Sequence, residues 1–489
     1  MPSLGLGYVA SYLRKNSAVP VRLRIIDMIA ERITPEGLVG RLQGEGIGGD
    51  RKGDDGNGGE GKGDDGISND RGGGDSQGEG HGYDFIGITS TTVTIHAAIR
   101  TAEACRKLYP KAKIVFGGVH PSVLPEEVLS HGCVDFVIRN EGEIPMCELV
   151  SGVPAERIRN LSFKKGGKIF HNPAQELIKN LDEIPFPAYD LMPVRKYYPA
   201  VGSYKRLPAL SVIATRGCPG QCTFCFKVFG RTLRSRSAKN IFDEVASLHE
   251  KYGMREIAFY DDTFTSFREN VKEFCRLLLS SGLKISWSCF SRVDCIDRET
   301  LALMKKAGCH QILYGVESAD AGILRNIRKG IDLEKVREAV KMTKEAGISP
   351  RCSFMIGNPG ETPETIERTI RFALELDPDL AMFNITVPFP GTKMFDWAKG
   401  NGLLLSENWD DYDLSKQVMR LPTISNRDLQ GFYSSAYRRF FLRPGYVFRR
   451  LIGVRSVEDA VELANGAKAV INVVKSRFVP SKKPVGSVV

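Results

Sequence analysis

Residues 216–225 read RGCPGQCTFC and directly follow the apolar run LSVIAT at residues 210–215. The run predicts a short buried strand, and the glycines and the proline after it predict a loop. Cys218, Cys222 and Cys225 therefore fall within eight residues on a loop at the carboxyl end of a strand. Chance rarely gathers three structural thiols at this spacing, whereas three thiolates placed in this way can surround one metal centre.

Two kinds of metal centre are compatible with three thiolates. A structural zinc site needs four protein ligands, usually as two pairs, and no second cysteine pair follows the loop. A four-iron cluster can be held by three thiolates, which leaves one iron open to another ligand. The sequence therefore favours an iron–sulfur cluster. A zinc- and nucleic-acid-binding protein that uses these cysteines and the basic C-terminal region is the distant alternative.

The chain around the cysteines alternates strands with helices. Between residues 206 and 400 we expect six strands with helical segments between them, near 211–215, 255–260, 284–290, 311–316, 350–356 and 380–387. Tandem strand–helix units form parallel sheets through right-handed crossovers. The pattern predicts an α/β fold, either a partial (β/α)6 TIM-type barrel or an open sheet. In both, the functional site lies at the carboxyl ends of the strands.

The cysteine loop, with Phe224 just before its last cysteine, resembles the signature of radical S-adenosylmethionine (SAM) enzymes. The resemblance implies that the three cysteines bind a [4Fe-4S] cluster, and that the amino and carboxylate groups of SAM bind the open iron. Residues after the later strands are similar to SAM-binding motifs of the family: Asp261 and Asp262 for the amino group, Arg292 for the carboxylate, Glu317 and Ser318 for the ribose, and Gly357, Pro359 and Gly360 for the adenine.

A second, Rossmann-like parallel sheet is expected within residues 1–150. Helices are predicted at 4–15, 95–108 and 125–131, and strands at 21–27, 85–89, 113–116 and 136–139. The LGLGY helix, the loops GIT, GGVHP and EGE, and the IPFPAYDLMP linker resemble the cobalamin-binding domain that precedes the barrel in one radical SAM subgroup. The chain starts at the loop that follows the family's first strand, so that strand is expected to be missing. The resemblance places cobalamin near Thr89, Ser90, Gly117, Gly118, His120, Glu141 and Gly142.

Composition narrows the class of protein. The chain has 489 residues, of which 42% are hydrophobic and 26% charged, values that are typical of globular proteins. No run approaches the roughly 18 apolar residues of a membrane-spanning helix, and the N-terminus lacks the pattern of a signal peptide. Eleven cysteines without an export signal argue against a disulfide framework. We therefore expect a cytoplasmic protein.

The remaining segments differ in composition from the two α/β units. Residues 44–82 hold 17 glycines and ten acidic residues against four basic ones, which predicts a disordered insertion. Residues 151–205 are expected to form a hairpin and a proline-rich linker, and residues 401–489 a helical, basic region. The stretch 438–450 interleaves five arginines with four aromatic residues. Either its aromatic residues pack on the barrel, or it contacts an anionic membrane surface or a lipid-like substrate.

Together the resemblances imply a radical SAM enzyme that acts on an unactivated carbon, with cobalamin-dependent methylation as the leading hypothesis. The alternative is a radical cyclase, oxidoreductase or other radical enzyme whose N-terminal domain does not bind cobalamin. Either one needs a low-potential electron donor of the flavodoxin or ferredoxin type. The substrate is expected to be a small or lipid-like molecule, and no nucleic-acid partner is expected.

Overall fold

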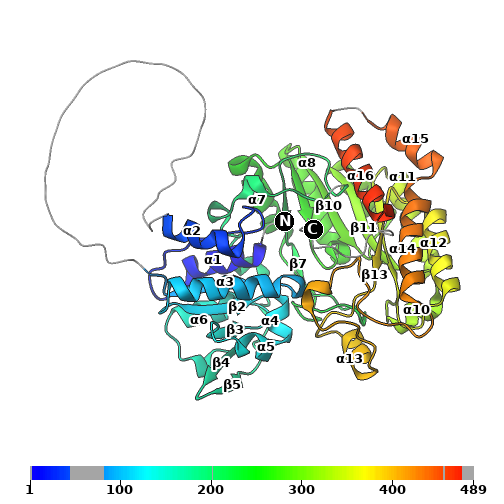
Figure 1. The fold of residues 1–489 in the computed structure, drawn as a ribbon. Helices are drawn as coiled ribbons and strands as arrows, with labels where there is room; N and C mark the ends of the chain where they lie inside the picture. Colours follow the sequence, from blue (N-terminus) through cyan, green and yellow to red (C-terminus); the bar gives the residue numbers. More distant parts are fainter. Residues whose placement is uncertain (1–2, 45–81, 201, 455–456, 476–489) are drawn as a thin grey trace.

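The computed structural model describes residues 3–44, 82–200, 202–454 and 457–475, which form two α/β modules and a helical C-terminal region (Figure 1). This arrangement confirms the predicted fold class. The Gly/Asp-rich insertion predicted at 44–82 lies almost wholly outside the described residues. None of the helices in the described ranges has the length and apolar character needed to cross a membrane.

The N-terminal module is built on a five-stranded sheet of order β1-β2-β3-β4-β5. β1 (Phe85–Thr89), β2 (Lys113–Gly117) and β3 (Phe136–Ile138) are parallel, and β4 (Leu161–Lys165) and β5 (Lys168–His171) continue the sheet as an antiparallel hairpin. Its helices are α1 (Leu4–Asn16), α2 (Pro35–Gly44), α3 (Ile95–Leu108), α4 (Val119–Val123), α5 (Pro125–Ser130) and α6 (Glu143–Val150). The hairpin predicted in a connector therefore belongs to this sheet, because β4 pairs directly with β3.

The prediction of a strand at residues 21–27 is wrong. No strand pairs with this segment in the described part of the chain. Its apolar side chains pack on the surrounding cores instead, Val21 and Leu23 on one and Ile26 on another. A strand needs a neighbouring strand to accept and donate its hydrogen bonds, so an alternating pattern alone does not secure one.

The second module is an opened barrel. Its six strands are all parallel and lie in the order β13-β12-β11-β10-β9-β6. Each strand therefore pairs with the barrel strand that precedes or follows it in the sequence. They are β6 (Ala209–Val212), β9 (Glu256–Phe259), β10 (Ser286–Ser291), β11 (Cys309–Glu317), β12 (Ser349–Ile356) and β13 (Leu380–Ile385). The helices between them are α7 (Ala238–Tyr252), α8 (Arg268–Ser281), α9 (Arg298–Lys306), α10 (Ala321–Asn326), α11 (Leu333–Glu345) and α12 (Pro363–Leu376). This is the predicted partial TIM-type barrel.

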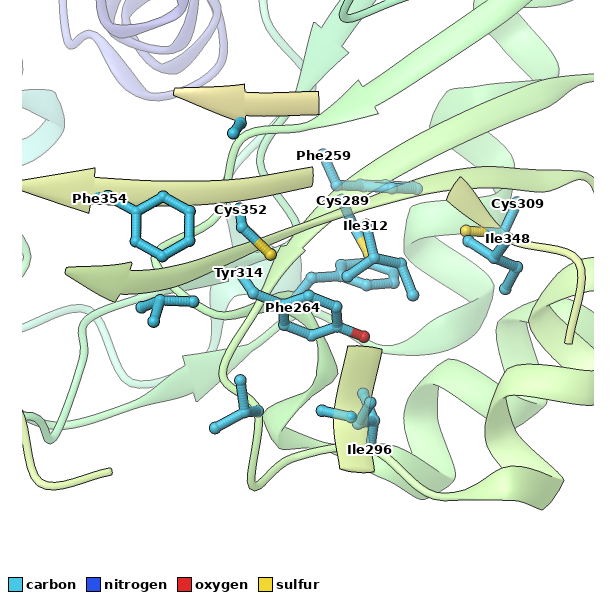
Figure 2. Close-up of a cluster of buried hydrophobic side chains, with 14 of the residues drawn as sticks. Phe259, Phe264, Cys289, Ile296, Cys309, Ile312, Tyr314, Ile348, Cys352 and Phe354 are labelled. Carbon is cyan, nitrogen blue, oxygen red and sulfur yellow. The ribbon is translucent and has the colours of Figure 1, made fainter. Parts of the chain in front are cut away.

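Aromatic and thiol side chains fill the layer between the barrel strands and the surrounding helices (Figure 2): Phe259 contacts Phe274 of α8, and the Tyr314 hydroxyl lies 2.8 Å from that of Thr343 on α11. Phe259 and Phe264 stack with their ring centroids 4.3 Å apart. Cys289, Cys309 and Cys352 are buried in the same region. Burial raises the pKa of the Cys352 thiol to about 12. The Cys352 thiol therefore stays protonated at neutral pH, and it acts as a packing group.

The C-terminal region is helical, as predicted. It contains α13 (Lys393–Gly400), α14 (Asn426–Phe441), α15 (Pro444–Ile452) and α16 (Val457–Lys475). In the arginine-rich stretch, Phe440 is fully buried and the Arg443 guanidinium lies 4.3 Å from the centroid of its ring. Arg443 also forms an ion pair of 2.8 Å with Asp377, which follows α12. This part of the stretch therefore packs its aromatic residues on the barrel.

The two modules share one hydrophobic cluster, which we call the shared core. Phe116 and Leu129 of the N-terminal module lie in it with Val387, Trp409 and Tyr412, which follow the last barrel strand. The Trp409 indole also donates a hydrogen bond of 2.7 Å to Glu127 at the start of α5. The carboxyl end of the barrel sheet is thus fastened to the N-terminal module.

Candidate active site

The cysteine loop is closed at its base by a short ribbon. β7 (Thr215–Arg216) pairs antiparallel with β8 (Arg234–Ser235), so the cysteines lie on the excursion between them. Gly217, at the start of the loop, has φ +91°, and a Cβ there would overlap the carbonyl of Thr232. In the middle of the loop, the Thr223 amide donates a hydrogen bond of 2.9 Å to the Ile327 carbonyl. The Thr223 carbonyl accepts a hydrogen bond of 2.9 Å from the Met394 amide. The loop therefore has a fixed backbone shape.

The sulfur atoms of the loop lie close together. A Cβ at Gly220 would be 3.4 Å from the Cys218 sulfur and 3.9 Å from the Cys222 sulfur. Withdrawal from water raises the pKa of the Cys225 thiol to about 11, with smaller contributions from Asp262 and the other two cysteines. In the described residues, no three His, Cys, Asp or Glu side chains converge as they would on a single metal ion. The ligands of a cluster bind separate irons and need no common point, so the three thiolates fit a [4Fe-4S] cluster.

Two cations face this group of sulfurs. Arg292, after β10, is bound by Asp294, and that hydrogen bond raises its pKa, with a smaller contribution from the Cys218 thiol. Burial alone would lower the pKa of Lys329, but Glu317 and the Cys222 thiol outweigh it and raise the pKa. Both side chains are therefore positively charged beside the sulfurs. This charge suits an anionic cluster or a ligand carboxylate.

Asp261 and Asp262 follow β9 and take different positions. Asp261 is buried, and its Oδ1 accepts hydrogen bonds from the amides of Ala214, at 2.8 Å, and Thr215. Its Oδ2 has no hydrogen-bond partner. Asp262 is exposed, and its negative charge helps to raise the pKa of the Cys225 thiol. Asp261 therefore holds the strand that leads into the cysteine loop, while Asp262 faces the sulfurs.

Asp261 should make the stability of the protein depend on pH. Burial raises its pKa from 3.8 to about 7, so the folded protein holds a proton that the unfolded chain releases. The stabilisation is complete below pH 3.8 and is lost as the pH rises through 7. We expect the free energy of unfolding to fall by about 1 kcal/mol from pH 6 to pH 8 because of this group. Asp261→Asn, which keeps the acceptor oxygen, should remove that part of the slope in denaturant titrations. Equal slopes in the two proteins would contradict the assignment.

The residues predicted for the ribose lie at the end of β11. Glu317 has φ +69° and forms an ion pair of 2.8 Å with Lys329. Ser318 is fully buried, and its hydroxyl lies 3.3 Å from that of Thr369 on α12. Of these two residues, Glu317 is the one connected to the cysteine loop, because its partner Lys329 lies near the Cys222 thiol. The sequence analysis did not predict Lys329. The one sequence feature that marks this residue is its position before Gly330, after α10.

The residues predicted for the adenine form a tight turn after β12. Gly357 and Gly360 have φ +96° and +86°, and a Cβ on Gly360 would clash with the side-chain amide of Asn326. The Glu361 carboxylate accepts the amides of Gly357, at 2.5 Å, and Asn358, at 2.9 Å. Burial raises the pKa of Glu361 to about 7. Glu361 therefore fixes the turn, and Pro359 contributes its carbonyl, which accepts 3.1 Å from Asn326.

The loops of the N-terminal module converge at the carboxyl ends of β1 and β2. Gly118 has φ +98°, and a Cβ there would clash with the Thr89 hydroxyl and the Ser90 carbonyl. The Ser90 amide donates a hydrogen bond of 3.1 Å to the Gly117 carbonyl. The buried hydroxyl of Ser90 has no hydrogen-bond partner. These residues thus form a close-packed edge with an unsatisfied hydroxyl, which suits a polar ligand at this end of the sheet.

His120 lies behind this edge. Its side chain is fully buried, and its ring lies 5.3 Å from that of Trp409 in an edge-on contact. Nδ1 is 3.4 Å from the Thr92 hydroxyl, while Nε2 is 3.6 Å from the Glu127 carboxylate and forms no hydrogen bond. The structure therefore places His120 in the contact between the modules, with no face open to a ligand in this conformation.

Glu141 lies between the modules rather than at an open edge. One carboxylate oxygen is 3.0 Å from the guanidinium groups of both Arg216 and Arg234, and the other accepts 3.1 Å from the Ile178 amide. Arg216 also forms an ion pair of 2.6 Å with Glu143. The three residues Arg216, Glu141 and Glu143, which we call the buried triad, connect the residue before Gly217 to the N-terminal module.

Gly142 and Gly391 mark two further close approaches. Gly142 precedes α6, and a Cβ there would lie 3.5 Å from Val9 of α1. Gly391, in the PFPGT loop after β13, has φ +77°, and a Cβ there would overlap Val123 of α4 and lie 3.2 Å from Phe226. Gly391 thus lies where the barrel, the cysteine loop and the N-terminal module meet. The carboxyl ends of the two sheets face each other at this point.

Comparison with known proteins identifies both modules. The Radical SAM superfamily model matches residues 212–373, and the B12 binding domain model matches residues 77–150. These matches confirm the predicted [4Fe-4S] cluster and SAM, and they support cobalamin as the third cofactor. The roles of individual residues, those of the three cysteines included, stay predictions.

Relatives and solved structures agree with these matches. The chain is 38% identical to the uncharacterized methyltransferase PH0819 of Pyrococcus horikoshii over 74% of its own length and 79% of that protein. It is 28% identical to the anaerobic magnesium-protoporphyrin IX monomethyl ester cyclase of Cereibacter sphaeroides, over 74% of this chain and 60% of that one.

Two solved structures share the fold. The cobalamin-dependent radical enzyme OxsB superposes with a TM-score of 0.69 at 16% identity, over 98% of this chain and 69% of that one. The methyltransferase TsrM of Kitasatospora setae gives 0.65 at 15% identity, over 91% and 87%. The fold, the cysteine loop and the two family matches agree, and the chain belongs to the radical SAM superfamily, among its members with a B12-binding domain.

Proposed function

We propose that the protein is a cobalamin-dependent radical SAM enzyme that methylates an unactivated carbon. The observation that carries the proposal is the junction at Gly391, where the loops of the B12-binding module meet the cysteine loop. A relative of 38% identity named a methyltransferase supports the same reaction class. A corrinoid at the edge of one sheet and a cluster at the edge of the other would then border one reaction space.

When bound, the cluster would supply the electron for reductive cleavage of SAM, and cobalamin would supply the capacity for methyl transfer. The chain's own residues hold this machinery in place. Cys218, Cys222 and Cys225 would hold the cluster, while Lys329 and Arg292 provide positive charge for the SAM carboxylate. The shared core and the PFPGT loop close the junction against water, which protects a reactive intermediate.

Anaerobic reconstitution tests the proposal. The protein would be incubated with iron, sulfide and hydroxocobalamin, desalted, and treated with SAM and a chemical reductant. We expect a retained corrinoid spectrum and the formation of 5'-deoxyadenosine, with S-adenosylhomocysteine as the sign that SAM also donates its methyl group. A cluster with 5'-deoxyadenosine but no retained corrinoid would overturn methylation. It would favour the cyclase or oxidoreductase alternative, which the 28% identity to the cyclase supports.

The partners of the reaction are part of the proposal. Radical SAM chemistry needs a low-potential electron, and we propose a flavodoxin or ferredoxin as its source. A lipid-like substrate or a peripheral membrane contact is supported by one face of α15, where Phe448, Leu451 and Ile452 are exposed by 64, 57 and 63% beside Arg449 and Arg450.

A further inference from the structure

We propose that a basic hollow beside the cysteine loop is the docking site of an acidic electron-donor protein, which delivers its electron to the cluster across Gly220. The inference rests on the proposed function and adds to it a surface and a class of partner. In the step itself, the reduced donor loses one electron and the oxidised cluster gains it. No bond forms or breaks.

The hollow, which we call the loop hollow, reaches the outer side of the cysteine loop. It has a volume of about 1120 Å³, and Pro219, Gly220 and Gln221 form part of its wall. A Cβ at Gly220 would be 3.4 Å from the Cys218 sulfur and 3.9 Å from the Cys222 sulfur. One residue without a side chain therefore separates the hollow from two cluster ligands.

The loop hollow borders the predicted SAM site. Of the described residues that we predict to hold SAM, Arg292 and Lys329 line it, and we assign both to the SAM carboxylate. Asp262, Glu317 and the turn at Gly357 are not part of its wall. A donor that rests on the backbone of Pro219 and Gly220 would therefore approach the sulfurs from the loop side, while most of the residues predicted for SAM lie outside the hollow.

The charge of the loop hollow favours an acidic partner. Arg325 and Arg328 line it and are exposed, and neither forms an ion pair within the described part of the chain. Exposed Arg231 lies at the cysteine loop, where its guanidinium donates a hydrogen bond of 3.5 Å to the carbonyl of Pro219, a residue of the hollow's wall. The acids in its wall already have partners. Asp294 binds Arg292, Glu334 binds Arg337, and Asp332 accepts hydrogen bonds from the amides of Glu334 and Lys335 at the start of α11.

Unpaired cations around a redox centre steer an acidic protein toward it and raise the association rate. A partner bound by contacts to Arg231, Arg325 and Arg328 would place its own redox group over Gly220. The surface therefore selects an acidic protein that carries a one-electron redox group.

The test compares two reductants on the reconstituted full-length protein. Flavodoxin hydroquinone is acidic, whereas reduced methyl viologen is a small cation. The rate of cluster reduction by each would be followed by stopped-flow absorbance. We expect Arg325→Glu with Arg328→Glu to slow reduction by flavodoxin roughly tenfold at low ionic strength and to weaken its salt dependence. Reduction by methyl viologen should not slow, because the new carboxylates attract a cation and do not repel it. Lys107→Glu, on the exposed side of α3, is the matched control and should leave both rates unchanged.

An unchanged flavodoxin rate in the double variant would overturn the inference. So would a wild-type flavodoxin rate that does not fall with added salt, and this measurement needs no variant. If the double variant fails to fold, Arg325→Gln and Arg328→Gln are measured singly, and each should slow only the flavodoxin reaction. Failure of the proposed function would appear differently, as a cluster that methyl viologen reduces without formation of 5'-deoxyadenosine or S-adenosylhomocysteine.

Discussion

Replacing Cys222 with alanine is expected to abolish cluster binding and SAM cleavage together. The cluster depends on three thiolates, and with two left it loses a protein ligand on one iron as well as the pattern that leaves a single iron open for SAM. Reconstituted Cys222→Ala should therefore contain little iron and sulfide, and it should form no 5'-deoxyadenosine within the detection limit. Iron analysis, visible absorbance and product chromatography check these three results.

Cys295→Ala is the matched control for this loss. Cys295 lines the loop hollow beside the cysteine loop, and its thiol lies 3.7 Å from the Ser266 hydroxyl, but it is not part of the cysteine loop. We expect this variant to keep the cluster and its activity. If Cys222→Ala retained the cluster, or if Cys295→Ala lost it, the assignment of the cluster ligands would be incorrect.

Arg216→Met is expected to lower the free energy of unfolding by about 3–5 kcal/mol, because it leaves the buried Glu143 carboxylate without its partner and removes one of the two arginines that bind Glu141. The side chains of Arg216, Glu141 and Glu143 are 3 to 5% exposed. Burial alone would lower the pKa of Arg216, but Glu143 and Glu141 outweigh it and raise the pKa, so the arginine stays charged. Denaturant titration of the purified protein measures the loss.

Arg14→Met provides the comparison. Arg14 also joins the N-terminal module to a distant segment, through an ion pair of 2.7 Å with Asp190, but its side chain is 41% exposed and its partner 56%. Exposed pairs contribute about 1 kcal/mol or less, so this variant should lose little stability. Adding Glu141→Gln and Glu143→Gln to Arg216→Met should recover part of the loss. Equal losses for Arg14→Met and Arg216→Met would contradict the role of the buried triad.

The sequence predicts the barrel well because each of its strands is followed by a helix with clear end signals. Thr362 and Pro363, for example, cap and begin α12 in the structure as their residue types predict. The strand at residues 21–27 failed for the opposite reason. Its alternation of apolar and polar residues is a local property, whereas a strand depends on a neighbour that may be far away in the chain.

The site could be predicted only in part. The spacing of Cys218, Cys222 and Cys225 is local and carries its chemistry in the sequence. The contact between Glu141 and Arg216 joins residues 75 positions apart, so no local pattern reveals it. Glu141 is predicted at the corrinoid because its EGE loop resembles that of the cobalamin-binding family, and only the packing of the modules shows that its carboxylate faces two arginines.

The shared core has a consequence for how this protein can be divided. Phe116 and Leu129 lose their cover if the chain is cut before the barrel, and Trp409 and Tyr412 lose theirs in the other fragment. The boundary between the two family matches therefore does not separate two independently folding units. Heat or denaturant should unfold both modules in one transition. A module could be replaced by that of a relative only if the shared-core residues of the relative were transferred with it.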